Sequence, residues 1–148
     1  MHARGAKDDS MIENVDALGV ILVDHGSRYQ AANDMLADVA DEFREATGVS
    51  IVEVAHMELA EPTLEQAFAR CVARGAKRIV VQPYFLAPGR HSTTDIPAMI
   101  ATIAPWYPGL SYCIAEPLGV DRHIADILAR RISEAIVRHA ADADPKQQ

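Results

Sequence analysis

The sequence predicts an α/β fold in which a four-stranded parallel sheet carries helices on both faces. Four short apolar runs alternate with longer segments of helical periodicity along the 148 residues, and strands that alternate with helices typically build parallel sheets. Three residues of metal-ligating types, His25, Glu58 and His91, follow successive apolar runs at equal intervals of 33 residues. We expect one domain over residues 16–141, with a flexible extension at 1–15 and a frayed tail at 142–148.

The first predicted strand is the run 18–23, which contains only apolar residues and glycine. Such a run is typical of a strand that is covered on both faces. It ends at the polar segment 24–28. A helix is expected at 29–47, because its apolar residues recur at helical spacing, and Gly48 is suited to cap its C-terminus.

The second predicted strand, 49–57, delivers Glu58 at its end. Pro62 is expected in the first turn of the following helix, where proline is tolerated, with Glu61 beside it as a capping carboxylate. Gly75 closes that helix. The third strand is expected at 78–86, and a loop that contains glycine then presents His91.

A third helix is predicted directly after His91, because the next four residues are all of types that cap helices: Ser92, Thr93, Thr94 and Asp95. A fourth strand is expected at 110–115. The last helix, from about Asp121, carries its large aliphatic residues on one side, which predicts a buried face: Ile124, Ile127, Leu128, Ile132 and Ile136.

Composition narrows the range of partners. The formal net charge of −7 argues against nucleic acid, which normally requires a basic face. No segment has the length and apolarity of a membrane span, and the N-terminus lacks the apolar core of a signal peptide, so we expect a soluble cytoplasmic protein with no membrane partner. Cys71 and Cys113 fall in apolar stretches and are expected to be buried thiols rather than a disulfide.

The three residues at the strand ends are the candidate site. The carboxyl ends of parallel strands share one edge, so His25, Glu58 and His91 are expected to converge there. Two imidazoles and a carboxylate suit iron, cobalt or nickel and leave coordination positions open. Each residue also has a structural alternative: a histidine can bind a loop carbonyl, and Glu58 can cap a helix or pair with an arginine.

Further residues near the strand ends could shape the site. His56 points to the same strand face as Glu58, although a satisfied core histidine is the more common case. A solvated position is the default for His123. Ser27 and Asn33 could orient the first loop. Fixed positive charge and hydroxyl groups could bind carboxylates or phosphates of a ligand, and the candidates are Arg28, Arg90, Arg122, Ser92, Thr93 and Thr94.

Over residues 17–140 the chain resembles the short sirohydrochlorin chelatases, class II tetrapyrrole chelatases that act without ATP. Three segments carry the resemblance: His25-Gly26-Ser27-Arg28 with Asn33, residues 58–62 (ELAEP), and residues 83–91 (PYFLAPGRH) leading to 95–97 (DIP). The segment 117–119 (PLG) also fits. The resemblance implies that His25 and His91 bind the metal, that Glu58 assists, and that sirohydrochlorin with its eight carboxylate arms lies in the cleft.

The resemblance also implies an activity, a set of substrates and an assembly. The reaction is insertion of cobalt, iron or nickel into sirohydrochlorin, in cobalamin, siroheme or related tetrapyrrole biosynthesis. The divalent metal is then a substrate, and no organic cofactor is implied. Because the chain is about half the length of two-domain members, a homodimer is expected. A histidine-rich tail and an iron–sulfur cysteine set, present in some relatives, are absent.

Two other functions compete with chelation. A phosphohydrolase or phosphomutase would normally place an arginine beside its nucleophilic histidine, whereas Asp24 precedes His25. A metal or tetrapyrrole carrier could use the same crevice without turnover. The carrier hypothesis predicts stoichiometric binding and no multiple turnover.

Overall fold

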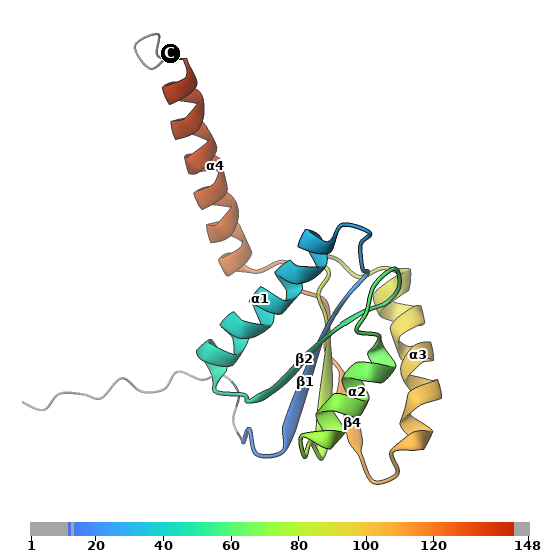
Figure 1. Cartoon of the computed structure of the whole chain (residues 1–148). Coiled ribbons are helices and arrows are strands. Elements are labelled where there is room, and N and C mark those ends of the chain that lie inside the picture. Colours follow the sequence, from blue (N-terminus) through green and yellow to red (C-terminus); the bar gives the residue numbers. More distant parts are fainter. Residues whose placement is uncertain (1–11, 13, 144–148) are drawn as a thin grey trace, which may run out of the picture.

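In the computed structural model, which describes residue 12 and residues 14–143, the chain forms the expected α/β fold (Figure 1). The expected extension at 1–15 and tail at 142–148 fall largely outside the described residues. The main elements, in chain order, are β1 (Leu18–Asp24), α1 (Gln30–Thr47), β2 (Ile51–His56), α2 (Leu64–Ala73), β3 (Arg78–Pro83), α3 (Ile96–Ile103), β4 (Ser111–Ile114) and α4 (Arg122–Asp142).

The four strands form one parallel sheet in the order β2-β1-β3-β4. Side chains of β1 alternate between its two faces, as the pleat requires. Ile21 and Val23 belong to a core with α2 and α3, whereas Val20 and Leu22 belong to a second core with α1. The prediction of helices on both faces is therefore confirmed, and β1, which has the longest apolar run, is covered on both faces as expected.

Two glycines contribute to the arrangement of these layers, one through its backbone conformation and one through a close approach. Gly48 adopts the left-handed conformation (φ +75°) as the C-cap of α1, as predicted, and its N–H bonds to the carbonyl of Arg44. Gly19 faces α2, where an added Cβ would lie 3.1–3.3 Å from Ala76 and Cys71. The sheet and α2 can approach each other closely because this position has no side chain.

The start of α2 differs from the prediction. Pro62 lies before the helix, in a cis peptide bond with Glu61, and Thr63 is the N-cap. The Thr63 hydroxyl accepts from the Gln66 N–H at 3.2 Å, and the Gln66 side chain accepts from the Thr63 N–H at 2.9 Å, which is a complete capping box. The capping role expected of Glu61 is thus wrong, because this box already satisfies the donors that a carboxylate would serve.

The cysteine prediction is right for Cys71 and wrong for Cys113. Both thiols are free, but only Cys71 is buried. Cys113 lies on β4, the edge strand, which pairs only with β3. Three of the four β4 residues are exposed, whereas Ile114 packs against the core that contains α2 and α3 residues. An apolar stretch at a sheet edge does not guarantee burial.

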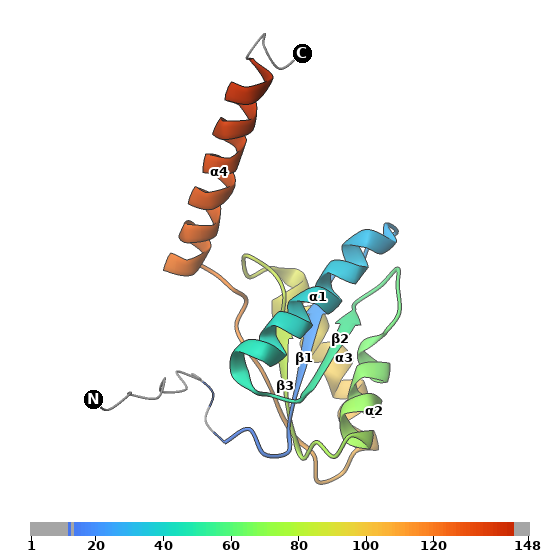
Figure 2. The ribbon, with the colours of Figure 1, turned by 60° about the vertical axis from the view of Figure 1, so that its left-hand side comes forward.

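The largest departure is α4. The helix begins at Arg122 with Asp121 as its N-cap, as predicted, but none of its residues is buried. Figures 1 and 2 both show it projecting away from the sheet and the other helices. The prediction of a buried face is wrong within this chain, since no described element packs against α4. Among the described residues, no helix has the length and apolarity needed to span a bilayer.

Candidate metal and substrate site

Three neighbouring strand ends supply the candidate ligands. His25 directly follows β1, Glu58 lies two residues beyond β2, and His91 opens a π-helical turn (His91–Asp95) that leads into α3. Because β1 lies between β2 and β3 in the sheet, the three segments meet at one edge. The expected convergence is confirmed, although His91 lies on a helical turn rather than in the preceding loop.

The distances place His25 at the centre of the group. Its Nε2 lies 2.9 Å from Oε1 of Glu58, and its ring centroid lies 4.6 Å from that of His91, with the planes at 71°. The side chains of His25, Glu58 and His91 are 41%, 57% and 49% exposed. The group is thus an open rim that a large ligand can reach from solvent.

Asp95 holds the ring of His91. Its Oδ2 lies 3.0 Å from Nδ1 of His91, one turn away along the helix. The Phe85 ring lies nearly parallel to the His91 ring, with centroids 6.4 Å apart. A hydrogen bond to a carboxylate places the proton on Nδ1 and leaves Nε2 free to bind a metal. Sequence reasoning assigned Asp95 to helix capping and missed this role, which the i, i+4 spacing could have indicated.

The backbone brings the loops of His25 and Glu58 together. The Glu58 N–H donates to the His25 carbonyl at 3.1 Å, and the Met57 N–H donates to the Asp24 carbonyl at 2.9 Å. Gly26 has φ +92°, and a Cβ there would lie 1.9 Å from the Glu58 carbonyl oxygen. Only glycine fits between these loops without displacing the backbone that carries Glu58.

Two buried polar side chains stiffen the same region. Asn33, 4% exposed, accepts from the Ser27 N–H at 2.9 Å and donates to the Ser27 carbonyl at 2.8 Å, so the expected orienting role of Asn33 is confirmed. His56, 2% exposed, bonds through Nδ1 to Asp24 Oδ1. His56 is therefore a satisfied core histidine, and sequence reasoning missed that Asp24 is its partner.

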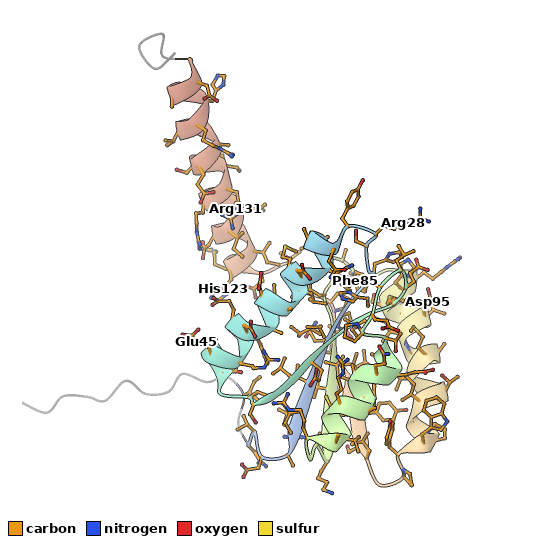
Figure 3. All side chains as sticks on the ribbon, in the orientation of Figure 1. Arg28, Glu45, Phe85, Asp95, His123 and Arg131 are labelled. Atoms are coloured by element: carbon orange, nitrogen blue, oxygen red, sulfur yellow. The ribbon has the colours of Figure 1, made fainter. Side chains whose placement is uncertain are left out.

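The arginines and hydroxyl groups divide into two kinds. Arg28 and Arg90 are exposed beside the rim and form no salt bridge within the described part of the chain. Ser92 and Thr93 instead serve the loop: both hydroxyls donate to the Gly89 carbonyl, at 3.2 and 2.7 Å, and Ser92 also accepts from the Gly89 N–H. Figure 3 shows Arg28, Phe85 and Asp95 at the end of the body where the strands terminate.

Two candidates from the last segment lie elsewhere. Arg122 and His123 form the first turn of α4, and the ring of His123, 90% exposed, is paired with Asp121. Figure 3 places His123 at the start of α4, away from Asp95 and Arg28. The default reading of His123 as a solvated helix-start residue is confirmed.

The rim brings the predicted ligands together without pre-forming a coordination sphere. Among the residues that the structure describes, no three His, Cys, Asp or Glu side chains are already arranged to hold an ion. The Glu58 carboxylate is instead bonded to Nε2 of His25, the atom that would bind the metal. The exposed Glu58 side chain would have to turn for His25 to coordinate.

Comparison with known proteins places the chain in a family. The CbiX family model matches residues 19–135. The chain is 50% identical over 129 residues to the chloroplastic sirohydrochlorin ferrochelatase of Arabidopsis thaliana, covering 87% of this chain and 57% of the relative. It is 36% identical to the sirohydrochlorin ferrochelatase of Priestia megaterium, covering 97% of this chain and 52% of that protein.

A shorter relative matches along its whole length. The sirohydrochlorin cobaltochelatase of Methanosarcina acetivorans is 33% identical, with 82% of this chain and 98% of that protein covered. The chain thus spans about half the length of the two ferrochelatases and nearly all of this cobaltochelatase.

Solved structures agree with the sequence matches. SirB from Bacillus subtilis with Fe³⁺ superposes with a TM-score of 0.74 at 30% identity, over 80% of this chain and 47% of SirB. The CbiX protein of Marinobacter aquaeolei, described as a cobalamin biosynthesis protein, gives a TM-score of 0.69 at 30% identity, over 82% of this chain and 98% of that one. With its sheet, its strand-end histidines and these matches in agreement, the chain belongs to the CbiX family.

Proposed function

We propose that the protein inserts a divalent metal ion, cobalt, iron or nickel, into sirohydrochlorin without ATP or an organic cofactor. The observation that carries the proposal is the contact of His25 with both Glu58 and His91 on an exposed rim. Relatives that share the family are named sirohydrochlorin ferrochelatases and cobaltochelatases, and one SirB structure is described as a complex with cobalt.

The rim groups supply the chemistry that insertion needs. The free macrocycle carries two pyrrole N–H groups, and the incoming M²⁺ replaces both protons, so each turnover releases two H⁺ and leaves the metal bound to four ring nitrogens. His25 and His91 hold the ion through Nε2, and Glu58 turns from His25 to bind the ion or accept a proton. Because the protein ligand set is incomplete, ring nitrogens can replace the histidines one after another.

The surroundings suit a flat, acidic ligand. Phe85 presents an apolar ring beside His91, and Arg28 and Arg90 offer fixed positive charge to carboxylate arms. Ser92 and Thr93, which we expected to bind substrate directly, contribute by holding the Gly89 loop that carries Arg90 and His91. Substrate anchoring by the two arginines explains how a chain of net charge −7 could bind a polyanion.

The same proposal includes an assembly and a location. The longer relatives have about twice the length of this chain. A homodimer of this chain would therefore bring together two domains. The two free thiols favour a reducing compartment, and we place the protein in the cytoplasm, although the Arabidopsis relative is chloroplastic. The domain is taken as residues 16–141.

The test follows metal insertion by absorbance under anaerobic conditions, with purified protein, sirohydrochlorin and an excess of Co²⁺, Fe²⁺ or Ni²⁺. We expect multiple turnovers above the uncatalysed rate, lost in His25→Ala and His91→Ala and retained in His123→Ala, which removes an exposed histidine far from the rim. Stoichiometric binding without acceleration of metal insertion would support the carrier function instead of the enzymatic one. Equal rates for all three alanine variants would reject the rim as the site.

A further inference from the structure

A side-chain hydrogen bond joins β1 and β2 directly beneath the rim. It links Nδ1 of His56 to Oδ1 of Asp24, whose side chains are 2% and 22% exposed, and is here named the strand-end bond. The two residues are partners at the last register position where β1 and β2 pair. His25 directly follows Asp24, and Glu58 lies two residues beyond His56. The strand-end bond therefore lies at the base of both segments that carry these rim side chains.

The backbone of His56 closes the loop that carries Glu58. Its N–H donates to the Pro62 carbonyl at 2.8 Å, so residues 57–61 leave the sheet and return to it at the same point. Within this loop Leu59 has φ +70°, in the left-handed region that residues with a branched side chain rarely adopt. A backbone in such a conformation persists only where the surrounding structure holds it. His56 supplies one of the bonds that hold the Glu58 loop.

His56 also lies close to the loop that carries His25. A Cβ added to Gly26 would lie 3.2 Å from Cβ of His56 and 1.9 Å from the Glu58 carbonyl oxygen. The backbone that follows His25 thus fits between these two groups, and the Glu58 N–H donates to the His25 carbonyl at 3.1 Å. A displacement of His56 would therefore be transmitted to both loops.

Burial gives the strand-end bond a positioning role. The His56 side chain is almost fully enclosed, so it cannot touch a metal ion or a macrocycle on the rim. A hydrogen bond in such surroundings is strong, and removal of one partner leaves the other buried and unsatisfied. The strand ends would then rearrange to satisfy the remaining polar group. A misplacement of reacting groups by about 1 Å can slow a reaction by about 100-fold.

We propose that Asp24 and His56 are positioning residues whose bond holds Glu58 against His25. The bond fixes the ends of β1 and β2 relative to each other, and the two loops inherit that arrangement. The inference deepens the proposed function and rests on it for the chemical use of the contact. The contact itself is a property of the folded chain and can be measured without turnover.

The third rim residue, His91, has a separate support. It follows β3 rather than β1 or β2, and Oδ2 of Asp95 lies 3.0 Å from Nδ1 of its ring. Loss of the strand-end bond should therefore alter the surroundings of His25 much more than those of His91. A general loss of stability would not distinguish the two histidines in this way.

The experiment records the ring-nitrogen signals of His25 and His91 by nuclear magnetic resonance, on the isotope-labelled full chain at a fixed pH. His56→Leu removes the donor and keeps an apolar side chain in the buried position. We expect the His25 signals to shift, because Glu58 no longer lies at Nε2, and the His91 signals to stay near their wild-type positions. His56→Asn places an amide N–H near the position of Nδ1 and is expected to restore the His25 signals.

Binding of Co²⁺ alone provides a second readout. Calorimetry is expected to show about 10–100-fold weaker binding for His56→Leu, the scale seen when the groups that orient metal ligands are removed, and near wild-type binding for His56→Asn. Glu53→Ala is the matched control, because it removes another polar contact of β2, the 3.3 Å pair with Arg74, three positions before His56. It is expected to keep the wild-type histidine signals and Co²⁺ affinity.

The strand-end bond is also broken from its other side. Asp24→Ala removes the acceptor at a less buried position and is expected to shift the His25 signals as His56→Leu does. Asp24→Asn keeps an oxygen that can accept from Nδ1 and is expected to retain the wild-type signals. If neither bond-breaking variant folds, His56→Asn and Asp24→Asn decide, since shifted His25 signals in both would contradict the proposal.

Three further outcomes would overturn it. A folded His56→Leu or Asp24→Ala protein with wild-type His25 signals would show that the strand-end bond does not position the rim. Equal shifts in His56→Asn and His56→Leu would mean that the hydrogen bond is not the cause. Equal shifts in Glu53→Ala would reduce the effect to general stability. A wild type without chelatase turnover would reject the proposed reaction and leave these signals to decide the positioning role, so the two proposals fail separately.

Discussion

Glu58 Oε1 lies 2.9 Å from Nε2 of His25, the imidazole nitrogen that we propose as a metal ligand. In the proposed mechanism, the carboxylate turns away from this nitrogen before an ion binds there. Both side chains are about half exposed, so their contact contributes little to stability. In the proposed reaction, the contact matters because it holds a base beside the rim where pyrrole protons would be released.

Glu58→Gln keeps the shape of the side chain and removes its basicity. We expect insertion to slow by about 100-fold, the scale of general-base contributions, with an unchanged thermal unfolding midpoint. Steady-state absorbance kinetics and circular dichroism measure the two quantities. Glu61→Gln, in the same loop, is the matched control. A wild-type rate for Glu58→Gln would remove Glu58 from the mechanism.

Asp95→Ala removes the carboxylate that holds Nδ1 of His91. We expect about 10–100-fold weaker binding of Co²⁺, because the ring loses its fixed tautomer and orientation. Isothermal titration calorimetry with Co²⁺ alone measures this affinity. Thr94→Ala alters an exposed neighbour on the same turn and should bind as the wild type does. Equal affinities for the two variants would mean that Asp95 does not position His91.

Arg90→Ala removes one charge beside the rim. We expect about tenfold weaker binding of sirohydrochlorin with little change in metal affinity, because a charge-assisted hydrogen bond to a carboxylate is lost. Arg70→Ala, an exposed arginine on α2, makes the same change in net charge elsewhere. Fluorescence titration measures the affinity of both variants for sirohydrochlorin. An unchanged affinity in Arg90→Ala would reject the anchoring role of Arg90.

Gly26→Ala is expected to destabilise the fold by about 2–4 kcal/mol and to abolish insertion. The added Cβ would lie 1.9 Å from the Glu58 carbonyl oxygen in a left-handed conformation, so the two loops must separate. Urea denaturation measures the loss. Gly89→Ala, where an added Cβ meets nothing within 4 Å, should remain close to wild-type stability. A stable and active Gly26→Ala protein would contradict the close packing of these loops.

The two thiols should differ in reactivity. Burial raises the pKa of the Cys71 thiol to about 12, with the nearby Glu53 charge acting in the same direction, so Cys71 stays protonated at pH 8. Cys113 is exposed. Ellman's reagent should therefore titrate one thiol per folded chain and two after denaturation. Rapid reaction of two thiols in the folded protein, or of one in a folded Cys113→Ser variant, would show that Cys71 is accessible.

Much of this architecture could be predicted because buried positions show a regular pattern of apolar residues in the sequence. The run 18–23 is apolar throughout since both of its faces are covered, and His25, Glu58 and His91 could be brought together once the strands were assigned as parallel. The partners of buried polar groups could not be predicted. The bond between Asp24 and His56 joins residues 32 apart whose register depends on strand pairing.

The misplaced predictions share a physical cause. Periodicity in α4 indicates that an apolar side exists, but does not identify the surface that covers it. Cys113 has apolar neighbours on an edge strand, where the helix layers of the fold end. Pro62 can precede a helix or begin it, and the capping box of Thr63 and Gln66 decides between the two. In each case the deciding contact lies outside the local pattern.

The exposure of the rim has a consequence for how the proposed site would compete for metal. An ion held by these half-exposed imidazoles would exchange readily with bulk solution, so small chelators such as free amino acids could remove it before sirohydrochlorin binds. Selection of one metal over another then depends as much on the composition of the surrounding metal pool as on the protein. Supplying different ions to the same unaltered chain should therefore change which metallated tetrapyrrole accumulates.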